Sequence, residues 1–166
     1  MTADDSRLAR LLDEADVTRV LYDYCDLVDA NRQADVLDLF TDDAVYDHGH
    51  DRVFRGRAGL AELFRALDDN VATSHHLTNV RVRFSHDDEA HAHSYLYAYH
   101  RRRASGDVVH LWGRYADTLV RAGGSWRLRS RALLAAAEQG VAPDPGRATR
   151  YQLIDRVGRD PDGRSL

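Results

Sequence analysis

The chain has 166 residues, of which 43% are hydrophobic and 30% are charged, a balance typical of one globular domain with a single core. Its formal net charge of -4 gives no electrostatic signal for binding DNA or RNA. No apolar run approaches the roughly 20 residues needed to cross a bilayer, so we expect neither a nucleic-acid partner nor a membrane partner.

The single cysteine and the first ten residues bear on the cell compartment. Cys25 has no second cysteine to pair with, so an intramolecular disulfide is impossible, and we expect Cys25 to pack as a small apolar side chain. Residues 1–10 are polar and acidic, without the apolar stretch of a signal peptide. These features predict a cytoplasmic protein.

Two apolar stripes recur at helical spacing in the first 30 residues. The first comprises Leu8, Leu11, Leu12 and Ala15. The second comprises Val17, Val20, Leu21, Tyr24, Leu27 and Val28. Because the two stripes are out of phase, we expect a short helix, a break near residues 13–16, and a longer helix that ends near Ala30.

Three shorter elements follow before residue 70. Residues 34–40 predict a second short helix, and residues 44–46 predict a short strand. Gly56 and Gly59 bracket the start of a third helix over about residues 57–67.

The second half of the chain alternates apolar and polar residues with a period of two, which is typical of strands. Its segments run over about residues 75–85, 89–103, 107–121 and 125–139. Short turn-like separators rich in Asp and Gly join them, so we expect an antiparallel meander of long strands. Helices first and strands second indicate an α+β fold with the helices on one face of a curved sheet.

We expect one domain over residues 1–140 and a C-terminal extension over residues 141–166. The extension holds all three prolines, at positions 143, 145 and 161. Residues 147–157 predict a helix within it, and the last residues are expected to be disordered.

Several sequence segments resemble the SnoaL-like family of the NTF2-like superfamily. They are LYDYCDLVDANRQADVLDLFTDDAVYDHG, SHHLTNVRV, YHRRR, GRYADTLVR and GGSWRLRSRALL. The resemblance covers about residues 5–140. It implies a cone, in which a strongly curved antiparallel sheet is closed by the N-terminal helices around an apolar pocket. The family includes scytalone dehydratase, bile acid 7α-dehydratase, the lindane dehydrochlorinase and polyketide cyclases.

The same resemblance implies an acid/base pair. Asp29 stands where the dehydratases and the dehydrochlorinase carry the acid of a catalytic dyad, and His75 stands where they carry the base. A carboxylate that accepts the N–H of an imidazole sets its tautomer and stabilises the imidazolium, so the pair can move a proton without a metal. Helix phase also favours Asp29 over Asp23 and Asp26, because it lies nearest the apolar stripe, where a carboxylate needs a partner.

Other side chains are candidates for the same site. Tyr24 matches a pocket tyrosine of the bile acid dehydratase, and its phenol could hydrogen-bond a substrate oxygen. His100 lies where scytalone dehydratase carries a second functional histidine. Some relatives use an arginine near the end of the domain, and Arg129, Arg131 and Arg150 are the candidates. We take Arg129 as a substrate-binding residue, together with Tyr46, His48, His100 and Trp112.

A metal site is the main competing interpretation. The pairs His48–His50 and His91–His93 each put two imidazoles within possible chelating reach. A third and a fourth ligand at a recognisable spacing are missing, as is the glutamate that a cupin carries after such a pair. The helical first half also disfavours an all-β cupin. We therefore expect no metal and no other cofactor.

The resemblance implies a dehydratase, or a cyclase or isomerase, that acts on an apolar cyclic metabolite of polyketide or steroid type. A non-catalytic ligand-binding or association module of the same fold is the alternative. An epoxide hydrolase is the third, with Asp47 or Asp117 and an arginine around a water. By analogy with the fold, we also expect a homodimer or homotrimer that pairs through the convex face of the sheet.

Overall fold

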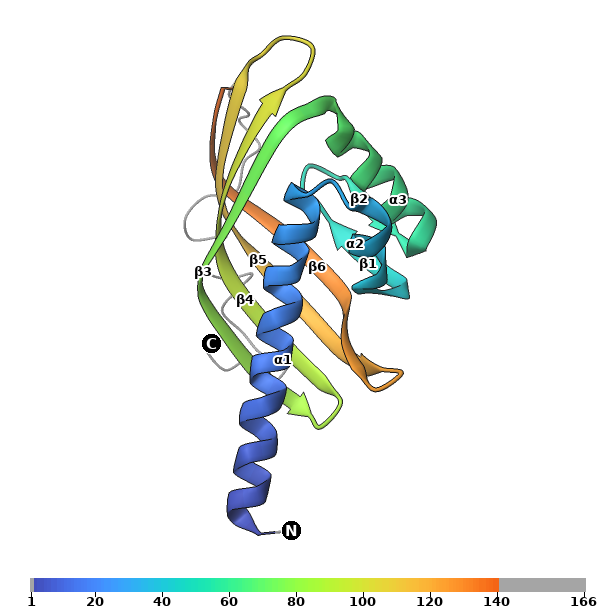
Figure 1. The fold of residues 1–166 in the computed structure, drawn as a ribbon, viewed down its shortest axis with the longest axis vertical. Helices are drawn as coiled ribbons and strands as arrows, with labels where there is room; N and C mark the ends of the chain where they lie inside the picture. The colour runs from blue at the N-terminus through green and yellow to red at the C-terminus, as the bar shows by residue number, and fades with distance from the viewer. Residues whose placement is uncertain (1, 141–166) are drawn as a thin grey trace.

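The computed structural model describes residues 2–140 and consists of three helices and a short 3₁₀ turn packed against one curved sheet (Figure 1). The helical elements are α1 (Ala3–Asp29), α2 (Gln33–Asp38), α3 (Gly56–Arg65) and η1 (Ala66–Asp69). The strands are β1 (Phe40–Asp47), β2 (Val53–Arg55), β3 (Asn70–His86), β4 (Glu89–Arg102), β5 (Val108–Ala122) and β6 (Ser125–Gln139). The α+β class and the antiparallel meander β3–β6 are confirmed. The helix expected at residues 147–157 lies outside the described residues.

The sheet differs from the expected all-antiparallel meander at one edge. Its strand order is β2-β1-β6-β5-β4-β3, and β1 pairs parallel with β6 while every other neighbouring pair is antiparallel. Tyr46 of β1 lies opposite Arg131 of β6. Residues 48–124, which contain α3 and the strands β2–β5, connect β1 to β6, because a parallel neighbour cannot be reached by a tight hairpin.

The expected break near residues 13–16 is wrong, because α1 runs without interruption for 27 residues. It begins with a capping box in which Thr2 accepts the Asp5 N–H and donates its own N–H to the Asp5 carboxylate. The phase change between the two stripes has another cause. Arg10 and Asp13 face the sheet, so the early leucines lie on the opposite side of one continuous helix.

The inner face of the sheet is the one that α1 covers (Figure 1). On β4, alternate residues are buried, namely Ala90, Ala92, Ser94, Leu96 and Ala98. The ring of Tyr24 on α1 lies 6.0 Å from that of Tyr115 on β5, which shows that this face points toward the helix. Tyr95, Tyr97 and Tyr99 therefore lie on the outer face, a choice that strand periodicity leaves open.

The end of α1 and the start of β3 meet above this core. Ala30 caps the helix, and Asn31 follows in a left-handed conformation with φ of 55°. β3 begins at Asn70 rather than at residue 75, because residues 70–73 already pair with the end of β4. His75 consequently lies inside a long strand, beside the last turn of α1.

None of the helices in residues 2–140 combines the length and the apolar character that a bilayer span requires.

Candidate active site

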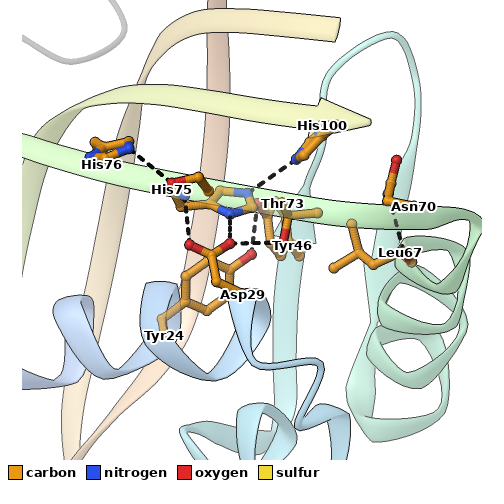
Figure 2. Close-up of polar contacts among 10 residues, drawn as sticks. Tyr24, Asp29, Tyr46, Leu67, Asn70, Thr73, His75, His76 and His100 are labelled. Atoms are coloured by element: carbon orange, nitrogen blue, oxygen red, sulfur yellow. Dashed lines mark hydrogen bonds and ion pairs between the residues drawn. The ribbon is translucent and has the colours of Figure 1, made fainter. Parts of the chain in front are cut away.

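Asp29 and His75 are in direct contact where α1 ends against β3 (Figure 2). The Asp29 Oδ1 atom lies 2.7 Å from His75 Nδ1 and accepts a hydrogen bond from the Thr73 hydroxyl at 2.8 Å. The Asp29 Oδ2 atom accepts the backbone N–H of His75 at 2.7 Å. Three donors from one strand therefore hold both carboxylate oxygens in place.

Hydrogen bonding keeps the Asp29 carboxyl ionised. Burial alone would raise its pKa, but the hydrogen bonds from His75 and Thr73 and the proximity of the imidazole outweigh burial, so the pKa of Asp29 lies below its usual value. An ionised carboxylate only accepts hydrogen bonds, so we assign the proton of the neutral His75 ring to Nδ1. The Nε2 atom of His75 then carries the free electron pair that a general base needs.

His100 on β4 faces that electron pair. Its Nε2 atom lies 3.3 Å from His75 Nε2, and the two ring centroids are 5.1 Å apart. Burial lowers the pKa of His100 to about 4, with further lowering by the His75 imidazole in its protonated form and by the charge of Arg102. His100 is therefore neutral near pH 7, and with His75 protonated on Nδ1 it is His100 that donates its Nε2–H across this contact.

His48, in the loop after β1, belongs to the same region. Burial lowers the pKa of His48 to about 4, and the charge of nearby Arg52 lowers it further. His48 is also close enough for its charge to lower the pKa of His100. The imidazole ring stacks on Tyr46 with ring centroids 5.9 Å apart.

Buried phenols and one arginine fill the interior next to this histidine cluster. The Tyr24 and Tyr46 hydroxyl oxygens are 3.5 Å apart, and burial raises the pKa of both phenols well above the usual value, so both stay neutral. Arg131 has its guanidinium carbon 4.1 Å from the ring centroids of both Tyr24 and Tyr115, in cation–π geometry.

Arg131 is anchored by a buried carboxylate but keeps one unused donor. Its Nε and Nη2 atoms donate to the two oxygens of Asp117 at 2.7 and 2.9 Å, and both side chains are 0% exposed. The pKa of Arg131 lies well above its usual value, because the attraction of Asp117 outweighs burial. The remaining nitrogen, Nη1, is buried and has no hydrogen-bond partner among residues 2–140. An unpaired charged donor in an apolar interior is suited to bind an oxygen or anion of a ligand.

Two of the predicted substrate-binding residues lie away from this cluster. Trp112 is 40% exposed on the outer face of the sheet, where it lines a cleft of about 450 Å³ beside Tyr97. Arg129 forms an exposed ion pair with Glu89. The structure thus brings together Asp29, His75, His100, Tyr24, Tyr46 and His48, but not Trp112 or Arg129.

The two histidine pairs considered as metal sites lie in different parts of the molecule. His91 contacts Glu89 and Thr118 on the outer face, whereas His48 lies by Tyr46. Within residues 2–140, no group of three or more His, Cys, Asp or Glu side chains could hold a metal ion.

Arg131 is the site residue that sequence reasoning left open, and Tyr115 is one that it did not select. Strict alternation from Trp126 and Leu128 would point Ser130 inward and Arg131 outward. The register of β5 and β6 shifts so that Leu119 opposes Leu128 but Thr118 opposes Ser130. The extra residue in this bulge is Arg129, and it turns Arg131 to the inner face.

Comparisons with known proteins agree with this fold. Residues 9–132 match a family model described as a SnoaL-like domain. A structure from Novosphingobium aromaticivorans, provisionally assigned as a scytalone dehydratase, is 25% identical with a TM-score of 0.78, and the match covers 84% of this chain and 97% of that one.

A second solved structure shows the same fold at lower identity. Hexachlorocyclohexane dehydrochlorinase LinA-type3 of Novosphingobium barchaimii is 17% identical with a TM-score of 0.74, and the match covers 83% of this chain and 96% of that one. No curated protein sequence matches this chain.

Proposed function

Because the chain belongs to the SnoaL-like family of the NTF2-like superfamily, we propose that it is a cofactor-independent lyase that eliminates water from an apolar cyclic substrate. The observation that carries the proposal is the Asp29–His75 contact at 2.7 Å, which leaves the second ring nitrogen of His75, Nε2, facing His100 at 3.3 Å. The similarity to a structure provisionally assigned as a scytalone dehydratase supports elimination of water over the other reactions of the family.

Each residue has a distinct task in the proposed reaction. His75 Nε2 takes a proton from a carbon next to a carbonyl group, and Asp29 stabilises the imidazolium that forms. The electron pair of the broken C–H bond forms the new double bond as the C–O bond to the hydroxyl group breaks. The departing hydroxide takes a proton from the protonated His75 and leaves as water. Cyclisation or isomerisation would begin with the same proton abstraction.

The remaining groups of the interior would bind oxygen atoms. The neutral Tyr24 phenol and the free Nη1 donor of Arg131 can hydrogen-bond a carbonyl whose charge grows as the proton leaves. His100 must give up its contact with His75 Nε2 when substrate enters, which frees its N–H for the departing oxygen. The surrounding aromatic and aliphatic core favours an apolar ring system as the substrate class.

The test measures proton abstraction directly. The purified chain would be incubated in D₂O with a panel of cyclic β-hydroxy ketones, and NMR would follow both deuterium incorporation at the α-carbon and loss of water. We expect His75→Ala and Asp29→Asn each to lower the rate at least 100-fold.

His76→Ala is the matched control, because this neighbouring histidine contacts Ser74 and the outer-face Tyr97 rather than Asp29. Circular dichroism would check that all three variants stay folded. Full turnover in either dyad variant would refute the mechanism.

A non-catalytic binding module is the second candidate, and one observation favours it. Asp29 also accepts hydrogen bonds from the His75 backbone and from Thr73, contacts that would stabilise the start of β3 without any chemistry. In that case the wild-type chain would bind ligands of this class without exchange or turnover, and Asp29→Asn would lower only the melting temperature.

The geometry gives an epoxide hydrolase less support. Such an enzyme needs carboxylates that activate a water molecule. Asp117 does pair with an arginine, but both of these side chains are 0% exposed, and the other candidate carboxylate, Asp47, accepts the backbone N–H of Gly49.

A further inference from the structure

Helix α1 has a second apolar face that the rest of residues 2–140 leaves exposed. Leu8, Leu11 and Leu12 are 59%, 56% and 59% exposed, and Tyr22 is 47% exposed. Four large apolar side chains on one side of a single helix form a contiguous stripe rather than scattered surface residues.

The sheet-facing side of the same helical segment is polar. Arg10 pairs with Asp87 and lies 4.2 Å from the ring of Phe84, and Asp13 contacts Arg121 and Trp126. Charged contacts therefore attach the first half of α1 to the domain, and they turn its leucines to solvent. In Figure 1 the first turns of α1 extend beyond the end of the sheet, and the helix continues along its inner face.

The spacing of the stripe is that of a helix–helix seam. Its central positions, Leu8, Leu11, Ala15, Thr18 and Tyr22, are separated alternately by three and four residues, as in a heptad repeat. The small side chains of Ala15 and Thr18 form a shallow hollow between Leu11 and Tyr22. Small residues at the centre with large ones on either side allow two helix axes to come close.

The charges beside the stripe favour one orientation. Asp16 and Arg19 pair at 2.7 Å along one flank of the seam. In an antiparallel pair with its two-fold axis between Ala15 and Thr18, Arg19 of each copy reaches Asp16 of the second copy. A parallel two-fold pair would instead place the flank that carries Asp16 and Arg19 against the opposite flank of the second copy, so this ion pair between copies could not form.

We propose that this face of α1 binds the same face of a second copy of the chain, so that two antiparallel helices form the centre of a two-fold symmetric dimer. Each partner presents the same patch, as a two-fold interface requires. Leu11 of each copy packs against Tyr22 of the other, and Ala15 packs against Thr18. The α1 interface is separate from the active site and is distinct from the outer sheet face around Trp112.

Sedimentation velocity of the full chain over a range of concentrations tests the proposal. We expect a dimer for the wild type and at least a 100-fold higher dimer dissociation constant for Leu11→Asp. Trp112→Ser is the matched control, because it removes a side chain of similar exposure from the outer sheet face and should leave the dimer unchanged. A monomeric wild type would overturn the proposal, as would a dimer lost in Trp112→Ser but kept in Leu11→Asp.

Charge exchange and cross-linking test the antiparallel register. Asp16→Arg and Arg19→Asp should each weaken the dimer, and the double variant should restore it.

Leu11→Cys and Tyr22→Cys should form a disulfide-linked dimer when the two proteins are mixed and oxidised, but not when either is oxidised alone. Cross-linking of either variant with itself would refute the antiparallel arrangement.

Discussion

Substitution of Asp117 by Asn should destabilise the protein severely, because it leaves the Arg131 guanidinium buried without a counter-ion. Arg131 and Asp117 are both 0% exposed and share two hydrogen bonds of 2.7 and 2.9 Å. Removal of one partner from such a pair costs about 3–5 kcal/mol. Since domains of this size unfold with about 5–15 kcal/mol, Asp117→Asn should lose a large fraction of the total stability.

Urea denaturation followed by tryptophan fluorescence and circular dichroism would measure this loss. We expect the free energy of unfolding to fall by about 3–5 kcal/mol, with a decrease in melting temperature of roughly 10–15 °C. Arg129→Ala is the matched control. It removes an arginine two positions away whose ion pair with Glu89 is exposed, and such pairs contribute about 0–1 kcal/mol.

The double variant Asp117→Leu with Arg131→Met separates burial of an unpaired charge from a general packing defect. Because apolar residues of similar volume replace both charges, at least half of the lost stability should return. The reasoning is refuted if Asp117→Asn costs less than about 1 kcal/mol, or if the double variant is no more stable than Asp117→Asn.

Three further perturbations follow from the structure. Burial lowers the pKa of His48 and His100 to about 4, so between pH 4 and about 6.5 the unfolded chain binds more protons than the folded chain. The free energy of unfolding should therefore fall as the pH drops through this window. Urea titrations at pH 7.5, 5.5 and 4.5 would contradict this if they gave the same free energy of unfolding. Gly113→Ala would place a methyl group 2.6 Å from the Leu134 carbonyl oxygen, so its melting temperature should fall by several degrees, and an unchanged value would show that the strands can separate. Leu21→Ala removes a fully buried side chain of α1 and should cost about 2–5 kcal/mol in urea denaturation, whereas a cost below about 1 kcal/mol would mean that the core collapses around the gap.

Local sequence signals predicted most of the sheet. The four segments of period two correspond to β3–β6, and the turns between them lie where Asp and Gly cluster. Hairpins are predictable in this way because neighbouring strands, their turns and their alternation are all encoded within about 30 residues. The parallel pairing of β1 with β6 joins segments more than 80 residues apart, and no local pattern encodes it.

Some residues of the candidate site were also predicted from the sequence, and others could be placed only from the structure. Resemblance to the SnoaL-like family selected Asp29 and His75, and the structure brings them within hydrogen-bond distance. Their catalytic role stays a prediction. The choice among the candidate arginines depended on a bulge at Arg129 that reverses the phase of β6, and Trp112 was misplaced because alternation does not say which face is concave.

By itself the sequence determined the α+β class, the order of helices and long strands, and the residue types able to move a proton, because composition, periodicity and turn chemistry are local properties. The tertiary structure alone decided that α1 is one helix, that Arg131 points inward with one free donor, and that the leucines of α1 face solvent. Each of these depends on which distant groups a side chain meets. Arg10 and Asp13 could be assigned to the sheet side of α1 only once their partners on β3, β5, β6 and the β3–β4 turn were in place.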